Sequence, residues 1–102
     1  MKNLNNKVTL LTGASSGIGA VIANLLTQNG VTVIGVARSK SGLNNTKSII
    51  EKHGGKFHCL PFDISQTSKL SELKDQVINI VGDVDILINN AGIEEYNYFQ
   101  DY

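Results

Sequence analysis

One glycine-rich turn constrains this chain more than any other feature: residues 12–19 read Thr-Gly-Ala-Ser-Ser-Gly-Ile-Gly. An apolar run precedes this turn, and apolar residues at helical spacing follow it. The glycines therefore stand where a buried strand turns into a helix, which is the context of a dinucleotide-binding turn. In that context Gly13 permits a tight exit from the strand, Gly17 leaves room for a pyrophosphate, and Gly19 lets the helix pack closely on the sheet.

The spacing of the glycines narrows the class of turn. It is G-x-x-x-G-x-G, which differs from the G-x-G-x-x-G of the commonest Rossmann turn. The turn is also not a P-loop, which needs four residues between its glycines and then Lys followed by Ser or Thr. Here three residues separate Gly13 from Gly17, and Ile18 follows Gly17. Taken alone, the turn leaves one alternative open, in which the glycines serve only the geometry of a strand–helix junction.

The pattern along the chain predicts the fold class. Apolar and β-branched stretches predict strands at residues 7–12, 31–37, 56–60 and 84–88. A helical pattern of the length of a right-handed parallel crossover separates each strand from the next. We therefore expect an α/β fold, a Rossmann-type half whose parallel sheet has about four strands in the order 3-2-1-4, with crossover helices. Its ligand site should lie beyond the carboxyl ends of the strands.

Two of the helices have expected boundaries that depend on polar residues. Residues 38–42 are expected to form a polar turn, after which a helix carries Leu43, Ile49 and Ile50 on one side. The third helix is expected to follow Ser65, which is a plausible N-cap.

Charge and composition indicate which partners to expect. Lys and Arg number nine and Asp and Glu number nine, without a basic patch, so no nucleic-acid partner is expected. No apolar run reaches the length of a membrane span, and residues 1–7 have no export signature, so we expect a cytoplasmic protein without a membrane partner. The single cysteine, Cys59, excludes an internal disulfide and is expected to be a buried, inert thiol.

With these motifs in place, the chain resembles the short-chain dehydrogenase/reductase family. The likeness is carried by the glycine turn, by Asp63-Ile64 and by the stretch Asn89-Asn90-Ala91-Gly92, which appear in order and at the spacing of the family. The resemblance covers the amino-terminal, cofactor-binding half of such a protein. Residues 1–102 are therefore expected to form a partial NAD(P)-binding Rossmann domain that stops after the Asn-Asn-Ala-Gly motif.

The resemblance also implies roles for individual residues. The turn would hold the pyrophosphate and the adjoining ribose through Gly13, Ser15, Gly17, Ile18 and Gly19. Asp63 would accept a hydrogen bond from the adenine amino group, and Ile64 would line the ring. The segment that passes behind the adenosine-side ribose toward the nicotinamide would be Asn90, Ala91 and Gly92. For Asp63 a helix-cap or turn role stays open, and for Asn-Asn-Ala-Gly a tight turn stays open.

The residues after the second predicted strand bear on the choice of cofactor. NAD-binding members of the family place an acidic residue at the strand end, where this chain has Ala37. Arg38 follows and can form bidentate bonds to a 2′-phosphate, and Ser39 could add a hydroxyl. Some NADP-preferring members have a second basic residue just before the middle glycine, where this chain has Ser16. Ser16 is also expected to be a cofactor-binding residue. NADP is therefore favoured and NAD is possible, with a solvated loop charge as the alternative for Arg38.

The catalytic residues that the family resemblance implies are not matched. Full members carry Ser and Tyr-x-x-x-Lys beyond the Asn-Asn-Ala-Gly motif, whereas here Gln100 stands four positions after Tyr96. No catalytic residue and no metal ligand is therefore assigned. We expect the nucleotide-binding portion of an NADP(H)-dependent oxidoreductase that interconverts carbonyl and alcohol, inactive in this form.

Two alternatives stay open beside this expectation. The chain could be a stand-alone nucleotide-binding or regulatory module, or a partner protein whose other half comes from a second chain. The predicted strand 84–88 is apolar on both faces, which favours the partial enzyme. Its unpaired edge also predicts self-association.

Overall fold

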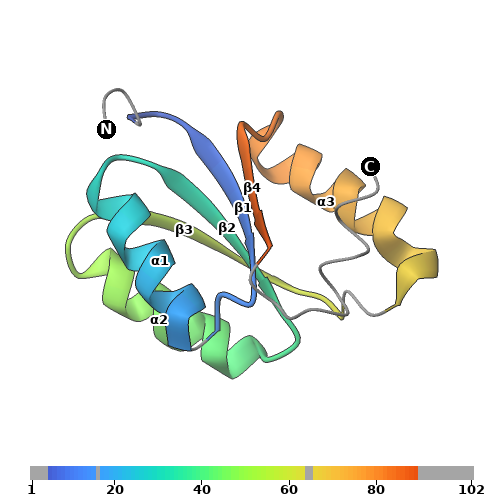
Figure 1. Cartoon of the computed structure of the whole chain (residues 1–102), viewed down its shortest axis with the longest axis horizontal. Helices are drawn as coiled ribbons and strands as arrows, with labels where there is room; N and C mark the ends of the chain where they lie inside the picture. The colour runs from blue at the N-terminus through green and yellow to red at the C-terminus, as the bar shows by residue number, and fades with distance from the viewer. Residues whose placement is uncertain (1–4, 16, 64–65, 90–102) are drawn as a thin grey trace.

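Strands and helices alternate along the chain in the computed structural model, which describes residues 5–15, 17–63 and 66–89 (Figure 1). The elements in chain order are β1 Val8–Thr12, α1 Gly17–Gln28, β2 Thr32–Ala37, α2 Lys40–Glu51, β3 Lys56–Pro61, the 3-10 turn η1 Thr67–Lys69, α3 Leu70–Val81 and β4 Ile86–Asn89.

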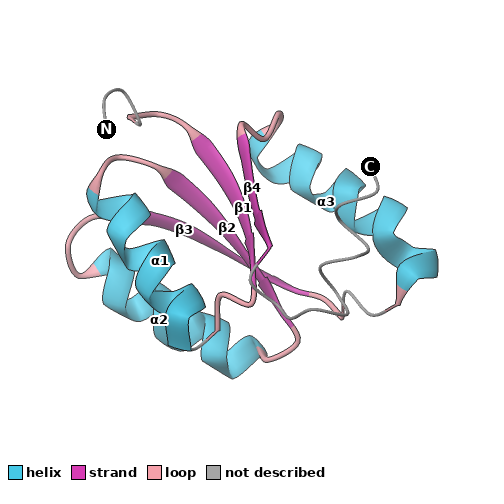
Figure 2. Cartoon of the chain, viewed as in Figure 1, coloured by secondary structure: helices cyan, strands magenta, loops and turns pink. Residues whose placement is uncertain are grey.

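The sheet is parallel throughout, with the strand order β3-β2-β1-β4. This confirms the predicted fold class and strand order. The helices α1 and α2 cover one face and α3 covers the other, so the chain forms three layers (Figure 2). Because β2 lies in the middle layer, its residues alternate between two cores: Val33 packs with the α1 and α2 side, and Ile34 packs with the α3 side.

The first helix, α1, buries one stripe and exposes another. Ala23 and Thr27 are buried, and Ile22 and Leu26 pack against the core on the same side. The apolar residues that point away from this core are exposed: Ile18, Val21 and Leu25. Helical spacing alone therefore identified the helix, while its position on the sheet decided which apolar residues are covered.

The second helix begins earlier than expected. The residues expected as a polar turn up to position 42 lie partly in α2, because Ser39 is its N-cap and accepts a hydrogen bond of 3.0 Å from the backbone N–H of Gly42. The expected apolar face was also wrong at one position. Leu43 and Ile50 are buried, but Ile49 is 47% exposed, since it lies one residue away from the stripe that faces the sheet.

The third helix and β4 also differ from the expected boundaries. The α-helix begins at Leu70 after η1, with Lys69 as the cap position and no side-chain cap; Ser65 lies outside the described residues. β4 begins at Ile86 rather than at residue 84. Asp85 instead joins the start of β1, accepting from the Val8 N–H through its carboxylate at 2.8 Å and donating its own N–H to the Val8 carbonyl at 2.9 Å.

The structure also bears on the expected membrane and edge properties. None of the helices in the described ranges is long and apolar enough to cross a membrane. β4 pairs with β1 on one edge, and no strand of the described residues pairs with its other edge.

Candidate functional site

The candidate site lies at the edge where the four parallel strands end. The register pairs Thr12 with both Val36 and Asn89, and Ala37 with Pro61, so the carboxyl ends of all four strands meet at one edge. The residues that follow these ends are the glycine turn after β1, Arg38 after β2 and Asp63 after β3. The structure therefore brings to one edge the sequence-predicted site residues that it describes: Gly13, Ser15, Gly17, Ile18, Gly19, Arg38, Ser39 and Asp63.

The remaining predicted site residues lie outside the described part of the chain. These residues are Ser16, Ile64, Asn90, Ala91 and Gly92. Their predicted roles stay predictions.

The glycine turn has the backbone that its residue types suggest. Gly13 and Gly17 have φ angles of 69° and 59°, in the left-handed region that side chains disfavour. Gly17 is exposed, and a Cβ built there would meet no atom of the described residues within 4 Å. Gly19 is buried in α1, as close helix–sheet packing requires. The turn thus combines a backbone that needs glycine with free space in front of it, which fits the approach of a phosphate group.

Helix N-termini give this edge its electrostatic character. α1 begins at Gly17 and α2 begins at Lys40, and neither helix has an acidic residue in its first turn. The positive end of each helix dipole therefore faces this edge, and no carboxylate of the same turn competes with a ligand for the first-turn N–H groups. An anion with two separated phosphate groups is the ligand class that such an arrangement favours.

Arg38 and Ser39 are exposed at the amino end of α2. The Ser39 hydroxyl oxygen accepts from the Gly42 N–H and lies 3.3 Å from the Ser41 hydroxyl oxygen. Its role as a helix cap was not predicted, but the cap uses only an acceptor lone pair. The hydroxyl proton of Ser39 remains available for an acceptor such as Ser41 or a bound phosphate.

A hydrogen bond joins β1 to β4 at the site. The buried Thr12 hydroxyl donates to the side-chain oxygen of Asn89 at 2.9 Å. This contact orients the first residue of the Asn-Asn-Ala-Gly stretch against the strand that leads into the glycine turn. Asp63 is half-buried, and its backbone carbonyl accepts a hydrogen bond from the Gln66 N–H at 3.0 Å.

Sequence reasoning missed two residues that support the turn. Thr46 of α2 donates its hydroxyl hydrogen to the Ala14 carbonyl at 3.0 Å. Gly42 lies so close to the turn that a Cβ built there would be 2.8 Å from the Cβ of Ser15. The sequence signal that could have found Thr46 is its hydroxyl, which stands on an otherwise apolar stripe of the helix between Leu43 and Ile50.

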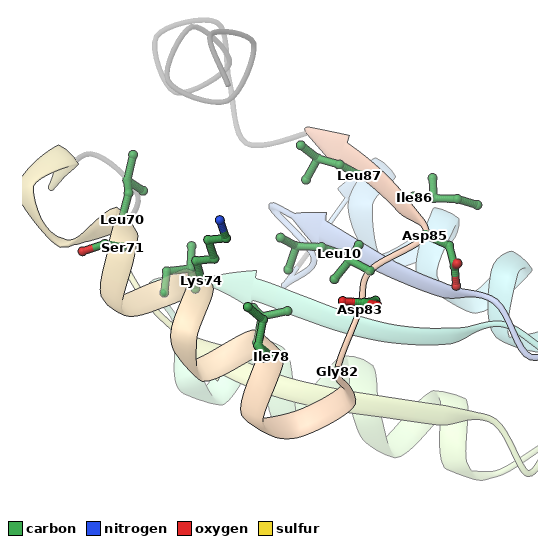
Figure 3. A pocket seen from close by; sticks show the side chains of 13 residues that line it. Leu10, Leu70, Ser71, Lys74, Ile78, Gly82, Asp83, Asp85, Ile86 and Leu87 are labelled. Atoms are coloured by element: carbon green, nitrogen blue, oxygen red, sulfur yellow. The ribbon is translucent and has the colours of Figure 1, made fainter.

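A groove elsewhere on the sheet does not belong to this edge site. It encloses about 590 Å³ between α3 and the β1–β4 pair, and none of the predicted site residues lines it. Figure 3 shows Leu10 of β1 and Leu87 of β4 on one side of it and Ile78 of α3 on the other. Its lining is mainly apolar, with Ser71 and Lys74 among its polar residues, and the amino ends of α1 and α2 do not line it.

The described residues offer no other site of clear chemistry. Among them, no group of His, Cys, Asp and Glu is placed to hold a metal ion. Burial raises the pKa of the Cys59 thiol above its ordinary value; nearby Lys47 lowers it and Glu51 raises it to smaller extents. Cys59 is only half-buried, so the expected burial is partial, and the inertness of its thiol stays a prediction.

Comparison with known proteins gives the family. Residues 7–102 match the short chain dehydrogenase family. The chain is 48% identical over 102 residues to the ketoacyl reductase HetN of Nostoc sp. (strain PCC 7120), covering all of this chain and 36% of that protein. It is 42% identical over 91 residues to a fatty acyl-CoA reductase of Acinetobacter baylyi, covering 89% of this chain and 31% of that protein. The chain thus spans about a third of the length of these relatives.

Solved structures agree with the sequence match. An actinorhodin polyketide ketoreductase determined with NADPH has a TM-score of 0.80 at 34% identity, over 91% of this chain and 36% of that one. A metagenomic short-chain oxidoreductase in complex with NADP has a TM-score of 0.83 at 33% identity, over 89% of this chain and 42% of that one. The glycine turn, the strand order and these matches together show that the chain belongs to the short-chain dehydrogenase/reductase family.

Proposed function

We propose that these residues are the nucleotide-binding portion of an NADP(H)-dependent oxidoreductase that interconverts a carbonyl and an alcohol. The observation that carries the proposal is the pairing of two helix N-termini, those of α1 and α2, at one edge of the sheet with Arg38 beside the second. A dinucleotide has anionic groups at two separated places, the pyrophosphate and, in NADP, the 2′-phosphate. In this proposal the amino end of α1 receives the pyrophosphate and the amino end of α2 receives the 2′-phosphate.

In this proposal the chain's own residues bind and orient the cofactor. The pyrophosphate and adjoining ribose are held by Gly13, Ser15, Gly17, Ile18 and Gly19, and Ser16 is a further cofactor-binding residue of the same turn. Asp63 and Ile64 receive the adenine, and Asn90, Ala91 and Gly92 run behind the ribose toward the nicotinamide. When bound, the cofactor supplies the hydride chemistry.

NADP is preferred over NAD in this proposal for a reason of charge. Ala37 at the end of β2 is half-buried and offers no carboxylate to a ribose diol. Arg38 is exposed directly after it, and the Ser39 hydroxyl and the first-turn N–H groups of α2 lie next along the chain. A phosphate there would gain a charge-assisted hydrogen bond that a hydroxyl cannot form as strongly. The NADPH and NADP carried by the two structural neighbours support this choice.

The proposal covers binding and not turnover by residues 1–102 alone. We infer that these residues form a partial Rossmann domain, since the Ser and Tyr-x-x-x-Lys of the family have no counterpart in them. We therefore expect binding of NADPH without carbonyl reduction. A single cysteine is typical of a reducing compartment, and we propose a cytoplasmic location on that ground.

Calorimetric titration with NADPH and with NADH tests the proposal directly. We expect both nucleotides to bind and NADPH to bind more tightly. Equal affinities would remove the preference for NADP while keeping the nucleotide site, and absence of binding by either nucleotide would overturn the proposed function itself. A parallel assay of NADPH absorbance with aldehydes and ketones should show no turnover.

A further inference from the structure

We propose that Thr46, in the middle of α2, is a positioning residue that sets the glycine turn for the cofactor. The expected effect on cofactor binding rests on the proposed function. The hold on the turn itself rests only on contacts among described residues. Thr46 is 3% exposed, and its Oγ1 lies 3.0 Å from the carbonyl oxygen of Ala14, to which it donates. Ala14 is itself fully buried, and the contact joins positions that are 32 residues apart.

A second buried threonine shows what an ordinary helical hydroxyl does. Thr27 of α1 is 6% exposed, and its hydroxyl lies 2.9 Å from the Ala23 carbonyl and 3.0 Å from the Asn24 carbonyl, both in its own helix. Such back-bonding is the usual local partner of a threonine inside a helix. Thr46 also has this local option, with the Gly42 carbonyl at 3.2 Å, but its shorter contact is to the turn.

The surroundings of this contact fit the turn closely. A Cβ built at Gly42 would lie 2.8 Å from the Ser15 Cβ and 3.2 Å from the Ser15 carbonyl oxygen, so α2 presses directly on the turn. On the β2 side, a Cβ built at Gly35 would lie 2.9 Å from the Ala14 Cβ. Neither Gly35 nor Gly42 has room for a side chain. Ala14 and Ser15 are therefore closely packed between β2 and α2.

The packing of Ala14 and Ser15 matters because these two residues lie between the two glycines of the turn that have positive φ angles. Ala14 and Ser15 stand between Gly13, whose N–H donates to the Val36 carbonyl at 2.8 Å, and Gly17, which begins α1. The direction of the N–H groups in the turn therefore depends on where the Ala14 carbonyl is held. Thr46 hydrogen-bonds the turn to α2, and Arg38 and Ser39 lie at the amino end of the same helix. The position of α2 therefore sets the distance between the two proposed phosphate sites.

Thr46→Val is the test, because it removes the hydroxyl and keeps the shape. Thr27→Val is the matched control, since it removes an equally buried threonine hydroxyl that contacts only its own helix. Two measurements are needed on the 102-residue chain: amide hydrogen exchange of the turn, and the affinity for NADPH. We expect Thr46→Val to speed exchange in the turn and to weaken NADPH binding about three- to tenfold, the worth of one neutral hydrogen bond. Thr46→Ser, which keeps the hydroxyl, should restore both.

The control separates positioning from general stability. Thr27→Val should lower the melting temperature by a similar amount without changing exchange in the turn or NADPH affinity. Equal behaviour of the two valine variants in the turn would overturn the inference. If the unaltered chain does not bind NADPH, the proposed function fails, and hydrogen exchange in the turn still decides the role of Thr46. If Thr46→Val does not fold, Thr46→Cys, with a much weaker donor in a similar volume, takes its place with the same expected results.

Discussion

Gly17 provides the sharpest test of whether the glycine turn serves a ligand or only the backbone. Its φ of 59° makes glycine favourable for geometry alone, and a Cβ there would meet no described atom within 4 Å. Gly54, between α2 and β3, matches both properties, with a φ of 82° and no described atom within 4 Å of its Cβ position. Replacing each by alanine therefore imposes the same kind of backbone strain at two places that differ in their distance from the proposed cofactor.

The expected cost in stability is similar for the two variants. A left-handed conformation costs an L-residue about 1–2 kcal/mol, and the smaller entropy of the unfolded chain offsets roughly 0.4–1 kcal/mol of this. A net loss of about 1 kcal/mol lowers the melting temperature by roughly 4–8 °C in a domain of this size. Valine would not separate the two roles, since a β-branched residue at positive φ adds strain of its own.

The two variants should differ in cofactor binding. In Gly17→Ala the new methyl group occupies the proposed place of the pyrophosphate and displaces at least one charge-assisted hydrogen bond, worth about 1.5–3 kcal/mol, so NADPH affinity should fall at least about tenfold. Gly54→Ala should bind NADPH as the unaltered chain does. Thermal melting by circular dichroism and calorimetric titration measure the two effects. If Gly17→Ala loses stability but keeps its affinity within about twofold, the turn needs Gly17 only for its backbone, and the assignment of Gly17 to the pyrophosphate is wrong.

Three further predictions concern charge, association and pH. Arg38→Asp should weaken NADPH binding by about 1.5–3 kcal/mol and change NADH binding much less, while Lys52→Ala, at the opposite end of α2, should change neither; titrations with equal losses for both nucleotides would contradict the phosphate role. The open edge of β4 should cause self-association, seen as scattering mass that rises with concentration and reduced by Leu87→Lys; a monomer at all concentrations would refute this. Burial raises the pKa of Cys59, so the folded state binds the thiol proton more tightly than the unfolded state does. The stability that the protonated thiol contributes is fully present below the pKa of the unfolded thiol, and it is lost as the pH rises through the pKa of the folded thiol. Denaturant titrations at rising pH should show this decline in the unaltered chain and less of it in Cys59→Ala, and equal slopes would contradict the prediction.

Local sequence patterns were sufficient for most of the fold. The glycine turn and the alternation of β-branched runs with helical spacing depend on short-range sterics and burial, which can be judged from neighbouring residues. They therefore predicted the parallel order β3-β2-β1-β4 and the edge where the described candidate residues gather. Boundaries were less predictable. The start of α2 depended on whether Ser39 caps a helix or belongs to a turn, and both are common uses of serine.

The sequence by itself thus determined the class of fold and the turn, because Gly13 and Gly17 stand where few other residues can adopt the backbone. Only the tertiary structure decided how that turn is held. The hydroxyl of Thr46 meets the carbonyl of Ala14 across 32 residues, and Gly42 gives Ser15 its room. The hydroxyl on the apolar stripe of α2 marks Thr46 in the sequence but does not identify its partner, since the contact exists only once α2 has packed on the sheet beside the turn. The same packing exposed Ile49 and buried Thr46, because a helix on a sheet covers one stripe, and the orientation of the whole element selects which residues lie in it.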